Sequence, residues 1–375
     1  MTKILILTAG FGEGHNAAAR AVAAAVDREA GPGTAKIADI FALAAPRANA
    51  LARRGYLGLI NRAPLAWSRF YHWVDRSRVV ERRLWLFARE ARVLRGLLLR
   101  EAPDAVVCTF PVCTFLLEQL ARGGGPAVPR FNVVTDSISI HSLWWRAACD
   151  GWFLPNADSA AVLLRAGIDP ARVQVSGFPV PAFFATQAGV LTPPDLAAGA
   201  APRVLQIINS GRRHAVATAR LLLAETDWEV TCAVGRDEAL RRQLTALAAG
   251  RRRPATILGW THEIPRLLMT HHVVVSKAGG ATTQEAINAL CPMVVSQVVP
   301  GQEEGNYELL RRHGAGTLAT TPGAVLAALR GAFADRGRAW REWRAALAPL
   351  AHPDAATVIA RHVLAAVPDP ATLSA

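Results

Sequence analysis

Two glycine-rich segments of the sequence each follow a short apolar run and lead into a helix-like stretch. In the first, residues 10–15 (GFGEGH), glycines let the backbone turn sharply and approach a ligand, and the following helix offers free N–H groups. His15 is expected at the N-terminus of this helix, where the dipole lowers the pKa of an imidazole and keeps it neutral. His15 is therefore a candidate proton acceptor, with Gly12 and Gly14 beside the ligand. A histidine that only caps the helix is the alternative.

A dinucleotide-binding loop is a second interpretation of the same segment. That fingerprint is G-x-G-x-x-G with an acidic residue about 20 positions later, whereas the third glycine here, Gly14, comes one residue early. Asp39, at the end of the second apolar run, could supply the ribose-binding acid. A nicotinamide or flavin enzyme is therefore an alternative.

Asp136 follows another buried-looking run, residues 131–135. Open α/β sheets bind their ligands at the carboxyl ends of their strands, so this carboxylate is expected near a ligand. It is a candidate base, or it could orient His15 or His141. Trp144 and His141 lie close behind it in the sequence and are candidates to line the same pocket. Capping of a loop by Asp136 is the alternative.

The second glycine-rich segment, residues 276–283, follows the apolar run 273–275 and begins a helix. Its glycine pair and threonines present N–H and hydroxyl donors suited to a diphosphate, so Gly279, Gly280 and Thr282 are candidate phosphate contacts. Glu285, in the first turn, could accept both hydroxyls of a ribose.

The loop of residues 300–306 (PGQEEGN) is dense in hydrogen-bonding side chains. Gln302, Glu303 and Asn306 together offer both donors and acceptors, which suits the several hydroxyls of a sugar. An acidic surface loop is the alternative. Taken together, the two segments indicate that the second half of the chain binds a nucleotide sugar.

Short apolar runs alternate with helix-like stretches along the chain, which is the βαβ pattern of a parallel sheet. Strand-like runs stop near residue 175, residues 181–202 are rich in Pro, Ala and Gly, and a second series starts at residue 204. The fold class predicted is α/β, with two Rossmann-like doubly wound domains. The boundaries predicted are an N-terminal domain over 1–180 with an insertion at 46–100, a linker at 181–202, a C-terminal domain over 203–335, and a helical tail over 336–375 that packs back on the N-terminal domain.

Composition supports a globular protein with two cores. The chain has 375 residues, 51% of them hydrophobic, and no apolar run near the roughly 18 residues that would span a bilayer. Its N-terminus lacks the layout of a signal peptide, and its five cysteines lack metal-ligand spacing. A cytoplasmic location and no bound metal are therefore expected. The net charge of +13 suggests an anionic partner.

The predicted insertion, residues 46–100, breaks the α/β pattern and is rich in arginine and aromatic residues. Docking on anionic membrane lipid is one interpretation, through arginine attraction and aromatic insertion. The candidate residues for this docking and for the neighbouring lipid site are Trp67, Phe70, Tyr71, Arg82 and Arg83. A helix that packs in the core with a solvated arginine face is the alternative; nucleic acid is not expected, since no module that binds RNA or DNA is recognisable.

The sequence resembles the monogalactosyldiacylglycerol synthases and processive diacylglycerol glucosyltransferases, which are relatives of the lipid-II-forming N-acetylglucosaminyltransferase. The pieces that carry this resemblance are residues 4–15 (ILILTAGFGEGH), 134–144 (VTDSISIHSLW), 175–179 (VSGFP), 259–268 (GWTHEIPRLL) and 276–316. They span most of the chain, and residues 300–306 are the most specific.

This resemblance implies a GT-B fold, two Rossmann-like domains that face a cleft, without an obligatory metal or other cofactor. The C-terminal domain would hold a UDP-sugar, with Gly279, Gly280 and Thr282 at the phosphates, Glu285 at the ribose and Gln302 and Glu303 at the hexose. Trp260 and Thr261 would lie by the uracil. Ser210 and Gly211 would also contact the donor, from a loop that is less glycine-rich than in relatives. The N-terminal domain would hold the acceptor and the insertion would dock on the membrane.

The function that follows is inverting transfer of glucose or galactose from UDP-glucose or UDP-galactose to diacylglycerol or a glycolipid, at the inner face of the cell membrane. His15 or Asp136 would be the base, and neither is preferred by sequence alone. A nucleotide-sugar epimerase or hydrolase, a transferase with another acceptor, and a membrane-associated binding protein without turnover are the alternatives.

Overall fold

We analysed a computed structural model of the protein, which describes residues 2–208, 214–301 and 303–367. By their contacts these residues form two compact units. The N-terminal unit lies within Met1–Ala182, Pro300–Gly305 and His352–Ala375, and the C-terminal unit lies within Phe183–Val299 and Asn306–Ala351.

The N-terminal unit is built on a six-stranded parallel sheet with the order β2-β1-β3-β4-β5-β6. Its strands are β1 (Ile4–Thr8), β2 (Ala35–Asp39), β3 (Ala105–Cys108), β4 (Arg130–Val133), β5 (Gly151–Leu154) and β6 (Val173–Val175). The central strands β1, β3 and β5 are buried along their whole length, which explains why they appear in the sequence as continuous apolar runs. The strand order reverses between β1 and β3, so the ligand-binding edge of this sheet is expected at their carboxyl ends.

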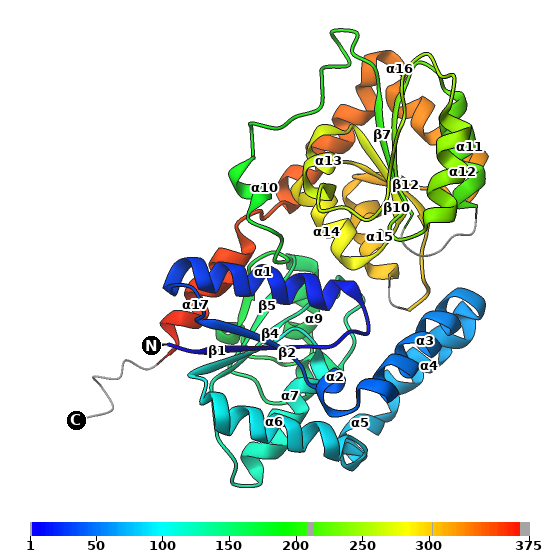
Figure 1. The fold of residues 1–375 in the computed structure, drawn as a ribbon. Coiled ribbons are helices and arrows are strands. Elements are labelled where there is room, and N and C mark those ends of the chain that lie inside the picture. Colours follow the sequence, from blue (N-terminus) through cyan, green and yellow to red (C-terminus); the bar gives the residue numbers. More distant parts are fainter. Residues whose placement is uncertain (1, 209–213, 302, 368–375) are drawn as a thin grey trace. The chain divides into compact units, whose positions relative to one another are not determined.

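Helices cover both faces of this sheet (Figure 1). Helices α1 and α17 lie on one face, and α2, α6 and α7 lie on the other. The helices outside residues 46–87 are α1 (Glu13–Ala30), α2 (Ile40–Ala44), α6 (Ala88–Glu101), α7 (Pro111–Arg122), α8 (Leu143–Arg146), α9 (Ala157–Arg165), the 3₁₀ turn η2 (Pro170–Arg172) and α17 (Ala355–Ala365). Alanines give α1 a narrow buried face, so α17 packs closely on it, and Arg361 pairs with Glu29 beside this contact at 2.7 Å.

Residues 46–87 of the predicted insertion form four helical elements of the N-terminal unit, and the rest of the insertion belongs to α6. They are α3 (Pro46–Arg62), α4 (Pro64–Ser77), α5 (Val79–Arg82) and the 3₁₀ turn η1 (Leu84–Phe87). Proline occupies the first position of both α3 and α4, where the missing N–H costs no hydrogen bond. Helix α4 ends because Arg78 adopts a left-handed conformation, with φ of 51°.

The C-terminal unit has a second parallel sheet, with the order β12-β11-β10-β7-β8-β9. Its strands are β7 (Arg203–Ile207), β8 (Glu229–Ala233), β9 (Thr256–Leu258), β10 (Val273–Lys277), β11 (Met293–Gln297) and β12 (Gly316–Leu318). Its helices are α10 (Phe183–Thr186), α11 (Ala215–Ala224), α12 (Glu238–Ala248), α13 (Ile264–Thr270), α14 (Gly280–Asn288), α15 (Glu304–His313), α16 (Pro322–Leu347) and the 3₁₀ turn η3 (Ala348–Leu350). The strand order reverses between β7 and β10.

The prediction of an α/β protein with two doubly wound parallel sheets is confirmed. The structure divides the segment that was predicted as one helical tail. Trp340 lies in the core of the C-terminal unit, whereas α17 belongs to the N-terminal unit. The predicted linker also contains α10, and its Leu196 packs in the core of the C-terminal unit.

Two adjacent histidines, His271 and His272, are buried in the C-terminal unit in the neutral state. Nδ1 of His271 lies 2.7 Å from the Leu267 carbonyl and its Nε2 lies 2.9 Å from the Thr231 hydroxyl. Nδ1 of His272 accepts the backbone N–H of Arg203, and its Nε2 lies 2.8 Å from the Pro194 carbonyl. Burial lowers the pKa of both imidazoles to about 4.

We expect the free energy of unfolding to fall as the pH is lowered from 7 to 5. The unfolded chain binds a proton at each histidine near pH 6.5, whereas folded His271 and His272 bind one only near pH 4, so the stabilisation is complete above pH 6.5 and is lost below it. Between pH 7 and 5 the loss is about 2 kcal/mol per histidine. Urea denaturation of the full chain measures it. The variant His272→Gln should show a weaker pH dependence than the control His72→Gln, which changes an exposed histidine; equal pH dependence in the two variants would contradict this account.

Candidate functional site

The carboxyl ends of β1, β3 and β4 bring together the first group of candidate residues. The glycine loop follows β1, Thr109 follows β3, and Thr135 and Asp136 follow β4. The loop approaches its neighbours closely: the Gly10 N–H donates to Asp39 Oδ2 at 2.9 Å, and a Cβ at Gly10 would lie 3.0 Å from Nη1 of Arg53. Asp39 also caps α2, accepting from the N–H groups of its first turn. Both carboxylate oxygens of Asp39 therefore accept backbone N–H groups. This does not favour the ribose-binding role that a dinucleotide enzyme would give to Asp39.

His15 lies at the third position of α1, and its ring is partly exposed. Nδ1 of the imidazole lies 2.7 Å from the carbonyl oxygen of Thr109 and 2.9 Å from the hydroxyl oxygen of Thr135. The edge of Phe110 packs against the ring at 5.1 Å between centroids, and the indole of Trp144 lies 6.3 Å away. Residues from the two segments that follow β3 and β4 therefore hold this side chain.

The pKa of His15 is lowered to about 4. Burial is the largest cause, because it disfavours the imidazolium, and the hydrogen bond with the Thr109 carbonyl opposes it. The direction agrees with the expectation from sequence, although burial rather than the helix dipole dominates. His15 is therefore neutral near pH 7 and can accept a proton.

Asp136 is bound to groups of its own loop. Its Oδ2 accepts the indole N–H of Trp144 at 2.9 Å, and the backbone N–H of His141 also hydrogen-bonds to it. Burial raises its pKa above the ordinary value, which these hydrogen bonds oppose. His141 is buried and its Nδ1 accepts the N–H of Leu143 at 3.2 Å. Trp144 is thus the link between Asp136 and the ring of His15.

A polar cluster attaches the insertion to the loop that carries Asp136. Asp75 of α4 accepts the Ser142 N–H at 2.7 Å, and its carbonyl accepts from both the Ser142 hydroxyl and Arg146. Arg146 also contacts Glu81 of α5 at 3.3 Å. The ring of Tyr71 packs edge-on against His141, with 4.9 Å between centroids. These contacts were missed in the sequence, because the partners are separated by about 65 to 70 residues.

The insertion exposes large apolar side chains among exposed arginines. Trp85, Leu86 and Trp73 are 66%, 55% and 54% exposed, and Arg82 and Arg83 are exposed beside them in the sequence. The aromatic side chains of α4 differ in exposure: Phe70 is 49% exposed, whereas Trp67 and Tyr71 contact Tyr56 and His141. At about 100° per residue, positions 67, 71 and 74 share one face of the helix, position 70 lies at the edge of that face, and position 73 lies about 120° from position 67.

In the C-terminal unit, the turn from β10 into α14 holds the second group of candidates. Gly279 is the N-cap of α14 and has no side chain with which to cap it. The first helical bond runs from the Thr283 N–H to the Gly279 carbonyl, so the N–H groups of Gly280, Ala281 and Thr282 precede the helical ladder. Glu285 is half-buried in the second turn. This helix end offers partial positive charge to an anion.

Two buried amide side chains flank the same turn. Nδ2 of Asn306 donates to the Ala278 carbonyl at 2.9 Å, and the Ala278 N–H donates to the Gln297 carbonyl. Among the described residues, Oδ1 of Asn306 and Oε1 of Gln297 are buried without a hydrogen-bond partner. Unpaired buried acceptors are costly, so they are suited to receive hydroxyl donors from a ligand. Gln297 was missed in the sequence because it reads as the end of an apolar strand.

The other predicted donor contacts lie elsewhere or outside the described residues. Glu303 is buried and is grouped by its contacts with the N-terminal unit. Trp260 follows β9, is 57% exposed and packs against His262, while the Thr261 hydroxyl accepts the Glu263 N–H. The remaining candidates, Gln302, Ser210 and Gly211, are not among the described residues.

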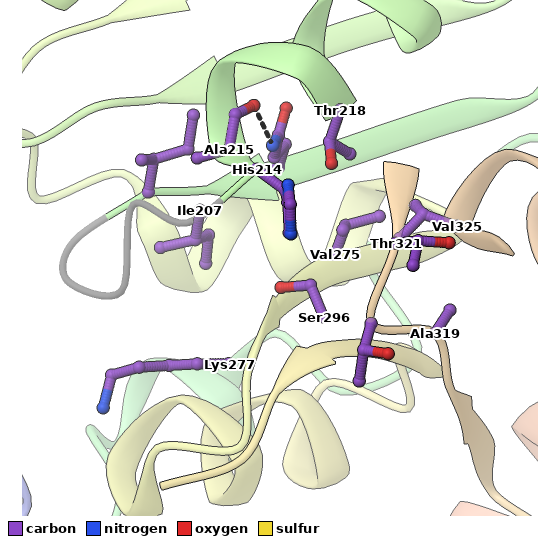
Figure 2. Close-up of a pocket in the computed structure, with 13 residues that line it drawn as sticks. Ile207, His214, Ala215, Thr218, Val275, Lys277, Ser296, Ala319, Thr321 and Val325 are labelled. Carbon is purple, nitrogen blue, oxygen red and sulfur yellow. Dashed lines mark hydrogen bonds between the residues drawn. The ribbon is translucent and has the colours of Figure 1, made fainter. Parts of the chain in front are cut away.

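A polar pocket lies at the ends of β7 and β10 (Figure 2). Its walls come from the ends of β7, β10 and β11, the start of α11, and the segment that joins β12 to α16. The polar side chains that line it are Gln206, His214, Thr218, Lys277, Ser296, Thr320 and Thr321. The described residues that line it include the basic side chains of Lys277 and His214 and no carboxylate, so it favours an anionic group. Lys277 lies two residues before Gly279, which connects the pocket with the α14 turn.

In the part of the chain described here, no three side chains of His, Cys, Asp or Glu are grouped as metal ligands. Within residues 2–208, 214–301 and 303–367, none of the helices combines the length and apolar character of a membrane span.

Comparison with known sequences finds similarity to lipid glycosyltransferases. A sequence model of the family "Monogalactosyldiacylglycerol (MGDG) synthase" matches residues 15–180. The chain is 24% identical over 333 residues to a processive diacylglycerol beta-glucosyltransferase of Bacillus thuringiensis (strain Al Hakam), covering 87% of this chain and 84% of that protein. The enzyme of the same name from Bacillus cereus (strain AH187) is 24% identical over 367 residues, covering 97% of this chain and 93% of its own.

Solved structures share the fold at low sequence identity. MurG of Acinetobacter baumannii has a TM-score of 0.60 at 15% identity, covering 97% of this chain and all of its own. Os79 of O. sativa, solved with U2F and trichothecene, has a TM-score of 0.63 at 14% identity, covering 96% of this chain and 100% of its own. The UDP-GlcNAc 2-epimerase of Neisseria meningitidis, bound to UDP-GlcNAc, has a TM-score of 0.59 at 12% identity, covering 97% and 100%.

These matches confirm the resemblance identified from the sequence motifs. The chain has the GT-B fold, and its sequence is similar to those of the monogalactosyldiacylglycerol synthases and the processive diacylglycerol glucosyltransferases.

Proposed function

We propose that the protein transfers a hexose from a UDP-sugar to the hydroxyl of diacylglycerol or of a glycolipid, with inversion at the anomeric carbon. The observation that carries this proposal is the neutral imidazole of His15, held at the point where the strand order of the N-terminal sheet reverses. The diacylglycerol acceptor and the hexose are suggested by the names of the related enzymes.

In the proposed reaction the acceptor oxygen attacks the anomeric carbon as the bond from that carbon to the UDP oxygen breaks. The acceptor proton passes to His15, and UDP leaves with the bonding electron pair. General base catalysis of this kind contributes about 10²- to 10⁴-fold in rate. Asp136 is the weaker candidate, because both the indole of Trp144 and the His141 N–H already donate to it. We propose that Asp136 instead positions Trp144 and the loop of residues 136–146.

The donor is proposed to lie along the carboxyl edge of the C-terminal sheet. Its diphosphate would meet the N–H groups of Gly280 and Thr282 and the basic pocket beside Lys277, which would stabilise the negative charge of departing UDP. Trp260, near the end of β9, is three strands away from β10 in the sheet, about 14 Å at the usual strand spacing. An extended uridine diphosphate would cover this distance, with the ribose at Glu285 between the two ends.

Residues of the loop 300–306 are proposed to bind the hexose, with Asn306 beside the α14 turn. The unpaired amide oxygens of Asn306 and Gln297 would accept sugar hydroxyls, and Glu303 and Gln302 would supply further acceptors and donors. UDP-glucose and UDP-galactose are the donors we propose.

The insertion is proposed to bind anionic membrane lipid and so bring the enzyme to its acceptor. Arg82 and Arg83 would contact lipid headgroups, while the exposed rings of Trp73, Phe70 and Trp85 enter the interface. The exposure of these rings favours docking over the core-packed alternative. The enzyme would then act as a peripheral protein at the cytoplasmic face of the cell membrane.

An epimerase of nucleotide sugars is the competing function, since a UDP-GlcNAc 2-epimerase has the same fold. It would act without lipid. Incubation of radiolabelled UDP-glucose and UDP-galactose with membrane lipid extract, followed by thin-layer chromatography, separates the two functions: label in the lipid fraction supports transfer, and a changed soluble sugar nucleotide supports the epimerase.

We expect His15→Ala to reduce transfer by about 10²- to 10⁴-fold, because the acceptor hydroxyl loses its base. UDP binding should not change. Asp136→Asn should cost less than about tenfold, since the amide oxygen can still accept from Trp144. Initial rates of both variants with saturating donor measure these effects. If Asp136→Asn is inactive and His15→Ala retains its rate, the two roles must be exchanged.

We expect Glu285→Gln to weaken UDP binding by about 10- to 100-fold, because hydrogen bonds to a charged acceptor contribute about 1.5 to 3 kcal/mol. Isothermal titration with UDP gives the dissociation constants. Glu238→Gln is the matched control, an exposed glutamate of the same unit that pairs with Arg241. Equal affinities for the two variants would place the ribose elsewhere.

We expect the double variant Arg82→Glu and Arg83→Glu to sediment poorly with vesicles that contain phosphatidylglycerol, while turnover of a detergent-dispersed acceptor is retained. The reversal replaces headgroup attraction by repulsion, with about 1 kcal/mol at stake for each arginine. The control is Arg241→Glu with Arg242→Glu, two exposed arginines on α12. Unchanged vesicle binding in the Arg82 and Arg83 variant would argue for the core-packed interpretation of the insertion.

A further inference from the structure

We propose that Thr135 is a positioning residue for His15: with the Thr109 carbonyl it holds the proton of the imidazole on Nδ1 and leaves Nε2 as the nitrogen that receives the acceptor proton. This inference rests on the proposed function, in which His15 is the base. It assigns a role to a residue that carries no obvious chemistry in the sequence.

The tautomer follows from the chemistry of the two contacts. A carbonyl oxygen can only accept a hydrogen bond, so the 2.7 Å contact with Thr109 requires a proton on Nδ1. A neutral imidazole carries one proton, and Nε2 therefore keeps its lone pair. The Thr135 hydroxyl oxygen, 2.9 Å from the same Nδ1, is a second acceptor for this proton.

The surroundings of the ring oppose the flipped orientation. A half-turn of the imidazole would place a carbon atom against the Thr109 carbonyl and forfeit both contacts of Nδ1. Phe110 and Trp144 stand on the sides of the ring and restrict its rotation. The imidazole of His15 is thus held on α1 with Nδ1 hydrogen-bonded inside the protein and Nε2 on the opposite side of the ring.

Three histidines of the described chain share a pKa lowered to about 4, and comparison of them supports this inference. His271 and His272 each use both ring nitrogens in hydrogen bonds inside the protein. In the described residues, the hydrogen bonds of the His15 ring involve Nδ1 alone. Nε2 of His15 is therefore available to a ligand, in contrast to the four ring nitrogens of the other two histidines.

The partner of Nδ1 differs from that in many catalytic histidines, where a carboxylate fills this place. Among the described residues, the charged groups nearest to the loop are engaged elsewhere. Asp136 accepts from Trp144, Asp39 accepts from the Gly10 N–H, and Glu13 pairs with Arg20. Arg53 lies over Gly10. Neutral acceptors therefore stabilise the imidazolium less than a carboxylate would, and the imidazole stays unprotonated at low pH.

The first test compares Thr135→Val, which keeps the shape and removes the hydroxyl, with Thr135→Ser, which keeps it. We expect the valine variant to lose about 10- to 100-fold in kcat with little change in the KM for UDP-sugar, and serine to restore most of the rate. Melting temperature and UDP affinity verify folding. A valine variant with the kcat of the unmodified enzyme, when His15→Ala is inactive, overturns the proposal.

The second test uses Thr135→Asp, which places a carboxylate at Nδ1. The acid limb of the kcat/KM profile should rise by about 1 pH unit or more, because an adjacent negative charge favours the imidazolium. A residue with only a structural role would not move this limb. A profile that keeps its original acid limb in a folded, active Thr135→Asp variant counts against contact of position 135 with Nδ1.

The third test does not depend on activity. Nitrogen-15 NMR of histidine-labelled protein distinguishes protonated from unprotonated ring nitrogens, and the His15 signals are assigned from their absence in His15→Gln. We expect a proton on Nδ1 at pH 7, and a proton on Nε2 would overturn the proposal. If His15→Ala keeps full transfer, the base role fails and the role of Thr135 falls with it, even where the spectrum shows the Nδ1–H tautomer.

Discussion

Both units depend on one constraint, the burial of a parallel sheet on two faces. Burial on both faces requires apolar side chains along the strands, as in β1 and β10, so polar chemistry is confined to the strand ends. Where the strand order reverses, neighbouring connections leave the sheet in opposite directions and expose the carboxyl edge. The glycine loop and Thr135 occupy that edge in one unit, and the α14 turn and the polar pocket occupy it in the other.

The same burial sets the protonation of the histidines. Desolvation lowers the pKa of His15, His271 and His272 to a similar value, yet the outcome differs with the number of ring nitrogens that are engaged. His271 and His272 are locked into the fold, and they add to stability only while they are neutral. His15 uses one nitrogen for orientation and keeps the other for a ligand. A lowered pKa alone therefore does not identify a catalytic histidine, and the hydrogen bonds around the ring decide the interpretation.

Periodicity and glycine placement were enough to predict two doubly wound domains and the loops at their carboxyl edges, because both signals are local. His15, Asp136 and Gly279 were proposed as candidates in this way. Thr135 and Gln297 were not, since a polar residue at the end of an apolar run has no distinguishing pattern until the neighbouring strand is placed beside it. The hydrogen bonds between Asp75 and Ser142 join positions that are 67 residues apart. Which aromatic side chains of α4 are buried depends on which face of the helix packs against the rest of the unit. Such facts are set by tertiary packing.

The hydrogen bonds between Asp75 and Ser142 attach the insertion to the loop that follows β4. Asp75 lies on the helix that exposes Phe70 and Trp73, and it holds Ser142 in the segment between Asp136 and Arg146. One turn earlier on α4, Tyr71 contacts His141. Through Asp75 and Tyr71, α4 therefore contacts the loop whose Trp144 borders the ring of His15. One helix thus carries both the surface proposed to meet lipid and the contacts to the loop beside the proposed base.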